Sequence, residues 1–359
     1  MKEIQEILKH VDTLAPEKDA VLATVVDVRG SSYRLPGAKM LILENGDSYG
    51  TVSGGCLEAD VMQHAGQVLE SGEPQIFTYD TTTNDDSVFS YNMGCRGVIR
   101  ILLEAIRSNP YVDFMRACFE REKGVAATSL DPGNEQAIGD RIFFVGDGIG
   151  QNEFADEEIR SKVVEILRSG RSSIERYDFG EVFFEYIAPP VSIKIFGAGA
   201  DAVPLAKLAN ELGWHTTIID HRTALANHER FDEPDEIIIS RPEDVSVKVR
   251  FEKESFAVVM THNYDHDRKI VGQLLKSDFP YVGLLGPKVR TENLIRELRE
   301  EGLEITKDDL EKLYAPVGLD TGAHLPETIA LSIIAEIQTV LAGRKGGFLK
   351  DRSGSIYDR

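Results

Sequence analysis

Two of the three cysteines in the sequence lie in glycine-rich segments, which are not typical positions for a packed thiol. Cys56 follows Ser53-Gly54-Gly55 at the predicted start of a helix, and Cys95 lies between Gly94 and Arg96-Gly97. A helix N-terminus favours the thiolate, the form of cysteine that binds soft metals and exchanges sulfur. Cys56 and Cys95 are therefore candidate metal ligands or sulfur carriers. The alternative interpretation is that both are small residues that fit tight loops.

The third cysteine, Cys118, differs from these two. It lies at helical spacing from Val112 and Met115, so we predict that it is part of a hydrophobic core. The sequence has no C-x-x-C pair, which argues against a structural zinc site. An odd number of cysteines in a long chain also argues against a disulfide framework and favours the cytoplasm.

A second candidate site is Gly197-Ala198-Gly199-Ala200-Asp201-Ala202, which follows a short apolar run. It matches G-x-G-x-x-A, where Gly197 makes a tight turn and Gly199 lets backbone approach a pyrophosphate. Asp220 follows the next predicted strand, where an acidic residue accepts a hydrogen bond from a ribose hydroxyl. Arg222 suits a 2′-phosphate instead. The glycines can also serve close packing alone, without a ligand.

Loops after two later predicted strands carry further candidates. His262 and His266, at i and i+4, can hold a metal together with Asp265, or can contact a ligand. Helix capping explains the acidic residues of this loop without any metal. Gly286 begins a turn that is followed by two cations, Lys288 and Arg290. This segment could bind an anion, or both cations could simply be solvated.

The elements that position these residues differ between the two halves of the chain. Short apolar runs alternate with helical patterns in the second half, which predicts a doubly wound, Rossmann-like parallel sheet. The predicted strands there are 191–196, 216–219, 236–239, 256–260 and 281–285. The first half predicts an α+β domain, with strands at 21–28, 39–43, 76–79, 98–104, 141–145 and 182–187.

Ala188-Pro189-Pro190 marks the predicted domain boundary, because two prolines fix an extended path and remove two backbone donors. We predict an N-terminal domain at 1–188, a Rossmann-like domain at 189–343 and a flexible tail at 344–359.

The composition limits the class of partner. The 359 residues carry a formal net charge of −20, which argues against binding to nucleic acid or to an anionic membrane surface. We expect no signal peptide and no membrane span, since the first residues mix charged with apolar side chains. Charge alone names no partner, because a local positive site can exist in an acidic protein.

Several of these segments together resemble the xanthine dehydrogenase accessory protein family (XdhC/CoxI type). In the first half the similar segments are 30–40, 53–58 and 94–97. In the second half they are 197–199, 261–262, 281–286 and 316–330. The sequence departs from the expected pattern at Ala200, where the family commonly has His, and at Cys95-Arg96-Gly97, where it commonly has Cys-Gly-Gly.

The resemblance implies a maturation factor, rather than a stand-alone xanthine dehydrogenase, that binds the molybdenum cofactor, assists its sulfuration and delivers it to a molybdenum hydroxylase. A cysteine desulfurase is a further implied partner, and we expect a homo-oligomer. Cys56 and Cys95 then contact molybdenum or carry sulfur. An anionic pterin phosphate would be held by helix N-termini, glycine N–H groups and local cations: Arg34, Lys39, Arg96, Lys288 or Arg290.

Two other functions remain open. The G-x-G-x-x-A segment with Asp220 also suits an NAD(P)-dependent oxidoreductase, in which His262 or His266 transfers a proton. The third hypothesis is a ligand sensor or scaffold that performs no chemistry.

Overall fold

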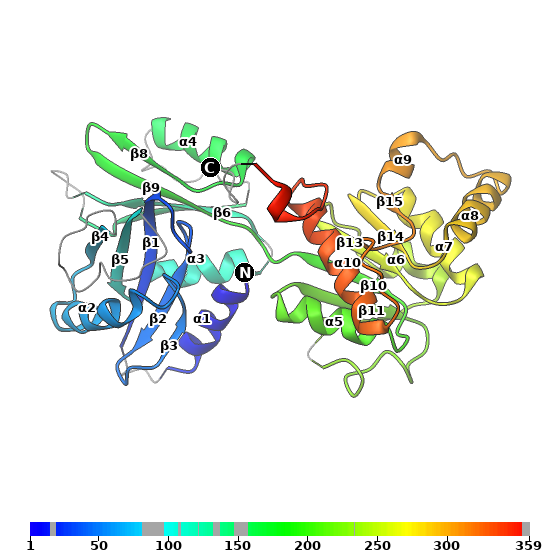
Figure 1. The fold of residues 1–359 in the computed structure, drawn as a ribbon, viewed down its shortest axis with the longest axis horizontal. Helices are drawn as coiled ribbons and strands as arrows, with labels where there is room; N and C mark the ends of the chain where they lie inside the picture. Colours follow the sequence, from blue (N-terminus) through cyan, green and yellow to red (C-terminus); the bar gives the residue numbers. More distant parts are fainter. Residues whose placement is uncertain are drawn as a thin grey trace. The chain divides into compact units, whose positions relative to one another are not determined.

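The computed structural model describes residues 1–14, 19–80, 97–106, 109–120, 122–131, 137–146, 157–232 and 234–353. The chain forms two compact units, unit 1 (Met1–Pro190) and unit 2 (Val191–Arg359), as Figure 1 shows. The division falls directly after Pro189-Pro190. Of the predicted tail, residues 344–353 are described and include a short 3-10 helix, Leu349–Asp351.

Unit 1 contains two antiparallel sheets. The first has the strand order β3-β2-β1-β5-β4 and the second the order β7-β6-β9-β8. The elements in chain order are α1 (Lys2–Asp12), β1 (Ala20–Gly30), β2 (Lys39–Leu43), β3 (Ser48–Gly50), α2 (Glu58–Ser71), β4 (Gln75–Asp80), β5 (Gly97–Ala105), α3 (Pro110–Phe119), β6 (Gly124–Ser129), β7 (Arg141–Val145), α4 (Glu157–Ser169), β8 (Ser173–Tyr177) and β9 (Gly180–Ile187). This mixture confirms the predicted α+β class.

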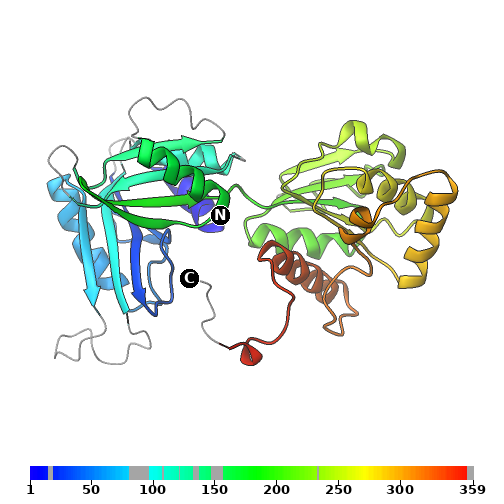
Figure 2. The same ribbon diagram turned by 90° about the horizontal axis from the view of Figure 1, so that it is seen from above.

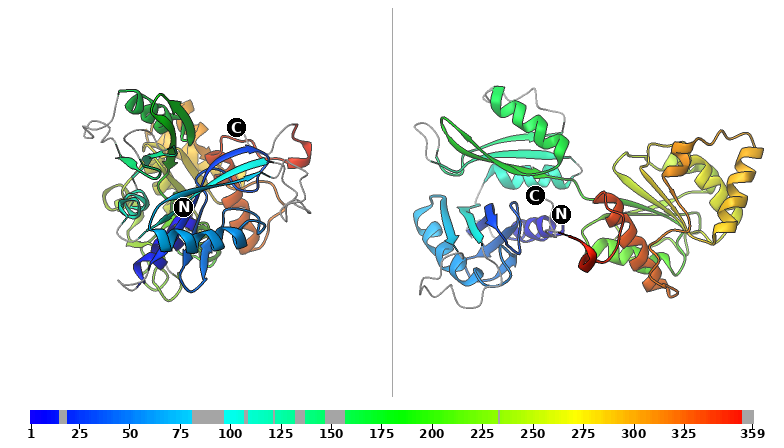
Figure 3. Two further views of the ribbon diagram at one scale, coloured as in Figure 1. Left: turned by 90° about the vertical axis from the view of Figure 1, so that its left-hand side faces the viewer. Right: turned by 45° about the horizontal axis from the view of Figure 1, so that its top comes forward.

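The period-two alternation of β1 shows how unit 1 is layered. Val21, Ala23 and Val25 point to one face and pack in a cluster with α2. Leu22 and Val26 point to the other face, where their clusters include residues of the second sheet. Helix α4 packs on strands β6 and β9 of that second sheet. The layers are therefore α2, first sheet, second sheet and α4 (Figure 3).

A network of charged side chains is buried between the two sheets. Lys39 in β2 is fully buried and pairs with Glu185 in β9. Tyr111 in α3 donates a hydrogen bond to the same carboxylate. Arg141 makes two 2.5 Å hydrogen bonds with Glu104 and lies 4.1 Å from the centre of the Tyr111 ring. Each buried charge thus has a partner of opposite sign, which burial requires.

Unit 2 is built on one parallel sheet with the order β12-β11-β10-β13-β14-β15. Its elements are β10 (Ser192–Phe196), α5 (Ala202–Glu211), β11 (His215–Asp220), β12 (Glu236–Ile239), η2 (Pro242–Asp244), α6 (Val245–Lys248), β13 (Ser255–Val259), α7 (Tyr264–Leu275), β14 (Tyr281–Leu284), α8 (Lys288–Glu300), α9 (Lys307–Glu311), β15 (Leu313–Tyr314) and α10 (Pro326–Leu341).

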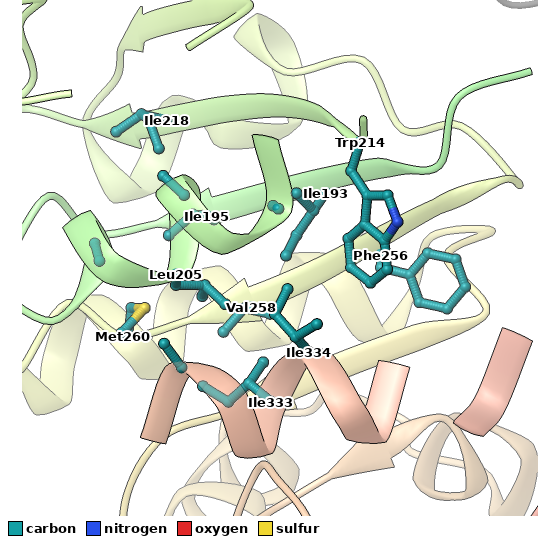
Figure 4. Close-up of a cluster of buried hydrophobic side chains, with 14 of the residues drawn as sticks. Ile193, Ile195, Leu205, Trp214, Ile218, Phe256, Val258, Met260, Ile333 and Ile334 are labelled. Carbon is teal, nitrogen blue, oxygen red and sulfur yellow. The ribbon is translucent and has the colours of Figure 1, made fainter. Parts of the chain in front are cut away.

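Helices cover both faces of this sheet (Figure 2). Helices α5 and α10 lie on one face, where Leu205, Ile333 and Ile334 pack against strand residues (Figure 4). Helices α7 and α8 cover the other face. The predicted Rossmann-like domain is therefore confirmed. In the described part of the chain, no helix is both long and apolar enough to cross a membrane.

Removal of Glu185 tests the buried network. Glu185→Ala leaves Lys39 without its anionic partner, so we expect unit 1 to lose about 3 kcal/mol or more of unfolding free energy in a denaturant titration. Asp113→Ala, which removes one of the two carboxylates paired with the exposed Arg116, should change it by about 0.5 kcal/mol at most. Equal effects of the two substitutions would contradict the assignment.

Candidate functional site

The order of strands in unit 2 reverses direction at β10. The chain moves from β10 to β11 and β12 on one side, and later returns to β13 on the other side of β10. Open parallel sheets bind ligands at such a point, at the carboxyl ends of the strands. The loop after β10 begins at Gly197, and the loop after β13 contains Thr261 and His262.

Gly197 allows these two loops to approach each other. Its φ is +119°, a conformation that favours glycine, and a Cβ at this position would lie 2.5 Å from the carbonyl oxygen of Met260. The first glycine of the sequence motif is therefore required for the backbone turn and for the contact with the end of β13.

The next residue, Ala198, is held on both sides of its backbone. Its N–H donates to the Asp220 carboxylate (2.8 Å), and its carbonyl accepts from Arg230 (3.1 Å). Asp220 also accepts from the backbone N–H of Arg222 (2.9 Å) and from its guanidinium (2.7 and 3.0 Å). Burial alone raises the pKa of Asp220, but the hydrogen bonds from Arg222 and Ala198 lower it to about 2.

This geometry bears on the expected role of Asp220. A carboxylate has about four acceptor positions, and the side chain of Asp220 already accepts four hydrogen bonds. A ribose hydroxyl would have to displace one of these donors. In this structure Asp220 holds the glycine loop in place and pairs with Arg222.

The second glycine faces the pair formed by Asp201 and His262. A Cβ on Gly199 would lie 2.8 Å from Oδ1 of Asp201 and 3.4 Å from Cδ2 of His262. Nε2 of His262 is 2.7 Å from Oδ2 of Asp201. His262 therefore lies at the glycine loop, close to the position where the sequence motif predicts a ligand.

The predicted anion site near Gly286 contains one paired cation and one exposed cation. Arg290 binds the buried carboxylate of Asp267 at 2.5 Å, and Thr261 donates to the same carboxylate at 2.6 Å. Burial raises the pKa of Asp267, although Thr261 and Arg290 oppose this shift. Lys288 is exposed at the first position of α8.

The loop after β13 does not assemble a metal site. In the described ranges, no three His, Cys, Asp or Glu side chains are grouped so that they could hold a metal ion. Asp265 and His266 therefore do not form a metal site with a third such residue in these ranges. The N-cap residue of α7 is Asn263, whose side chain accepts the hydrogen bond from the His266 N–H (3.1 Å). The expected capping by an acidic residue of this loop is therefore wrong.

In unit 1 the Cys56 loop is organised by the buried Ser53 hydroxyl. This oxygen accepts hydrogen bonds from the N–H groups of Gly55 (3.1 Å), Cys56 (3.2 Å) and Leu57 (3.1 Å). The hydroxyl donates to Glu58. These N–H groups are consequently bound within the loop, while Cys56 itself is exposed. The loop presents an exposed cysteine, and the N–H groups of residues 55–57 are not free to bind an anion.

Glu58 supports the same loop through its two carboxylate oxygens. It accepts from Thr51 Oγ1 (2.6 Å) and from the Ser53 backbone N–H (2.9 Å), as well as from the Ser53 hydroxyl. Burial opposes ionisation of this carboxylate, but the donors from Ser53 and Thr51 prevail and lower the pKa of Glu58. An anionic Glu58 thus fixes the position of Ser53 and, through it, of Cys56.

The segment 31–37 lies next to the Cys56 loop. Tyr33 packs against Gly54, since a Cβ there would be 3.5 Å from Cγ of Tyr33, and its side chain is 63% exposed. Gly97 lies against the same segment, because a Cβ on it would be 2.7 Å from the Ser31 carbonyl oxygen. The segments 30–40 and 53–58 that carry the family resemblance are therefore neighbours. Cys95 and Arg96 lie outside the described residues.

The two cations predicted for this site are both engaged by carboxylates. Arg34 pairs with Glu3 of α1, and the ammonium group of Lys39 is buried against Glu185. Cys118 is buried in α3, and burial raises the pKa of its thiol to about 12.

Four residues of these sites were not identified as candidates from the sequence: Tyr33, Glu58, Asp201 and Arg230. Glu58 is the first residue of α2, and the N-cap residue Leu57 makes no side-chain cap, so no capping box marks Glu58 in the sequence. The positions of Asp201 and Arg230 depend on contacts between segments far apart in the chain, for which the sequence contains no signal.

Comparisons with known proteins match both units. The XdhC and CoxI family model matches residues 13–80, and the XdhC Rossmann domain model matches residues 193–337. Over 329 residues the chain is 32% identical to a Bacillus subtilis (strain 168) protein named as a probable xanthine dehydrogenase subunit, covering 90% of this chain and 94% of the relative. It is 25% identical to the molybdenum cofactor insertion chaperone PaoD of Escherichia coli (strain K12), covering 92% and 86%.

A solved structure is also similar. A crystal structure described as a xanthine dehydrogenase from Bacillus halodurans matches with a TM-score of 0.77 and 29% identity, covering 96% of this chain and 97% of that chain. The fold and the sites define a class of two-unit proteins, in which an α+β unit with a thiol loop precedes a Rossmann domain. The chain belongs to the XdhC and CoxI family, which confirms the resemblance seen in its motifs.

Asp220→Asn tests the anchoring of the glycine loop. Because the pKa of Asp220 is depressed to about 2, its ionised form stabilises the fold above about pH 4, and this contribution is lost as pH falls towards 2. We expect Asp220→Asn to lower the unfolding free energy at pH 7 by about 1 kcal/mol, allowing for solvent screening. The difference from the unsubstituted protein should shrink between pH 4 and 2. Asp320→Asn, at an exposed aspartate, should show no such dependence.

Proposed function

We propose that the protein is an accessory factor that binds the molybdenum cofactor, assists its sulfuration and delivers it to xanthine dehydrogenase or a related molybdenum hydroxylase. The observation that carries the proposal is the exposed Cys56 thiol on a loop fixed by Ser53 and Glu58. The similarity to a protein named as a molybdenum cofactor insertion chaperone, across 92% of this chain, supports it. The cofactor is the cargo of such a protein.

The donor chemistry of unit 1 fits this cargo. Thiolate is a soft ligand that suits a molybdenum centre, and Cys56 is an exposed residue whose Sγ lies 3.6 Å from the Ser53 hydroxyl oxygen. A bound metal can replace this weak contact. The side chain of Tyr33 is mostly exposed beside the same loop, and a planar pterin can stack on an aromatic ring. We therefore assign Cys56 to the metal and Tyr33 to the pterin.

Sulfuration requires a sulfur donor, and we propose that a cysteine desulfurase supplies it. The cytoplasm, which we propose as the compartment, is reducing and keeps an exposed thiol free. The exposed position of Cys56 gives both the donor and the hydroxylase client access to the cargo.

The alternative function is an NAD(P)-dependent oxidoreductase. The G-x-G-x-x-A loop at the carboxyl end of β10, where the strand order of the Rossmann sheet reverses, favours it. The engagement of Asp220 by four hydrogen bonds disfavours the usual ribose contact. Titration of the full chain with NAD and NADP separates the two functions. The oxidoreductase function requires one of them to bind, whereas the accessory function needs neither.

Cys56→Ser provides the main test. We expect the protein purified anaerobically from cells that make the pterin cofactor to contain molybdenum and pterin, and Cys56→Ser to retain at least fivefold less molybdenum. The control is Cys118→Ala, at the buried cysteine, which should retain the cargo. A correctly folded, unsubstituted protein without molybdenum and pterin would contradict the proposed function.

Tyr33→Ala tests the stacking assignment separately. Loss of one aromatic stacking contact should weaken retention of pterin by about tenfold, measured by fluorescence of the released and oxidised pterin. Tyr33→Phe keeps the ring and should retain pterin as the unsubstituted protein does. Equal retention by the Ala and Phe variants would show that the ring does not contact the cargo.

A further inference from the structure

A histidine–aspartate pair lies at the carboxyl ends of β10 and β13 in unit 2. Asp201 precedes α5, and its Oδ2 is 2.7 Å from Nε2 of His262, which follows β13. The side chain of Asp201 is 12% exposed and that of His262 is 58% exposed. The carboxylate is therefore nearly buried, whereas more than half of the imidazole is exposed to solvent.

Two neighbouring carboxylates, Asp220 and Asp267, pair with arginines, Arg222 and Arg290 respectively. Asp201 is instead hydrogen-bonded to His262, and its second oxygen, Oδ1, is buried without a hydrogen-bond partner within the described residues. In the described part of the chain, the side-chain partner of Asp201 is therefore an imidazole and not a guanidinium.

The backbone of His262 is held in an unfavourable conformation. Its φ is +59°, and among the described residues it is the one non-glycine residue with a positive φ. Such a conformation is energetically unfavourable for a residue with a side chain and is typical of functional sites. The turn is closed by Thr261, whose hydroxyl oxygen accepts a hydrogen bond from the Asn263 N–H (3.2 Å) on the other side of His262. The strained turn directs the imidazole towards Asp201 and Gly199.

We propose that Asp201 and His262 form an acid–base pair for a nucleotide-type or pterin-type ligand bound at the glycine loop. Asp201 is the positioning residue and His262 is the group that touches the ligand. Because the carboxylate accepts from Nε2–H, the neutral imidazole has Nδ1 as its free acceptor. Nδ1 then accepts a hydrogen bond from an O–H or N–H group of the ligand, such as a ribose hydroxyl or a pterin N–H.

Proton transfer follows the same geometry. If the ligand group ionises, its proton moves to Nδ1 while Nε2 keeps its own proton. The resulting imidazolium is then balanced by the adjacent Asp201 carboxylate. The identity of the ligand rests on the proposed function, but the direction of the hydrogen bond rests on the geometry of the pair alone.

The first part of the test is spectroscopic and needs no ligand. In the full chain labelled with ¹⁵N-histidine, we expect His262 in its neutral form to carry its proton on Nε2. A protonated Nδ1 in the neutral form of the unsubstituted protein would overturn the assignment, because an ionised Asp201 carboxylate can only accept a hydrogen bond from Nε2–H.

The second part measures binding of two probes, the anaerobically released molybdenum cofactor and NADPH. We expect His262→Gln and Asp201→Asn to weaken binding of the probe at the glycine loop by about tenfold. His228→Gln, at an exposed histidine outside this pair, should bind as the unsubstituted protein does. Thermal unfolding confirms that each variant is folded.

The outcomes separate this inference from the proposed function. If the cofactor binds and His262→Gln binds it equally well, the acid–base pair is overturned while the accessory function stands. If the cofactor does not bind and NADPH binds in a His262-dependent way, the accessory function fails and the pair is supported. If neither probe binds the unsubstituted protein, both are overturned.

Discussion

The ammonium group of Lys39 and the carboxylate of Glu185 meet between the two sheets of unit 1, out of contact with water. A lysine that is fully buried must have an anionic partner, so the position of β2 is tied to that of β9. Lys39 also donates to the Gly37 carbonyl (3.0 Å), at the end of the segment that carries Tyr33. The buried pair therefore fixes the segment that lies against Gly54 and the thiol loop.

Unit 2 fixes its own loop by a different means. The backbone of Ala198 is bound by Asp220 on one side and by Arg230 on the other, while Gly197 lies against the end of β13. The glycine loop is consequently rigid before any ligand arrives. In both units the polar groups nearest the loops bind one another. Cys56 and Tyr33 in unit 1, and His262 in unit 2, are nevertheless exposed and can meet a ligand.

The sequence predicted the Rossmann sheet well, because β10, β11 and β13 are short apolar runs bounded by turns. It did not predict β6 (Gly124–Ser129), whose small residues are buried on both faces and show no alternation, or β15, which has two residues. Pairs such as Lys39–Glu185 and Asp201–His262 join residues 146 and 61 positions apart, and no local pattern encodes such contacts. For this reason Lys39 was expected to meet an anionic ligand, whereas in the structure it meets Glu185.

The central claim is that the Cys56 thiolate binds the metal of the cargo. Molybdenum K-edge X-ray absorption of the full chain, purified anaerobically with its cargo, tests this claim most directly. We expect the unsubstituted protein to show one more sulfur neighbour of molybdenum than the cargo reconstituted with Cys56→Ser. Identical sulfur coordination in the two samples would contradict the account.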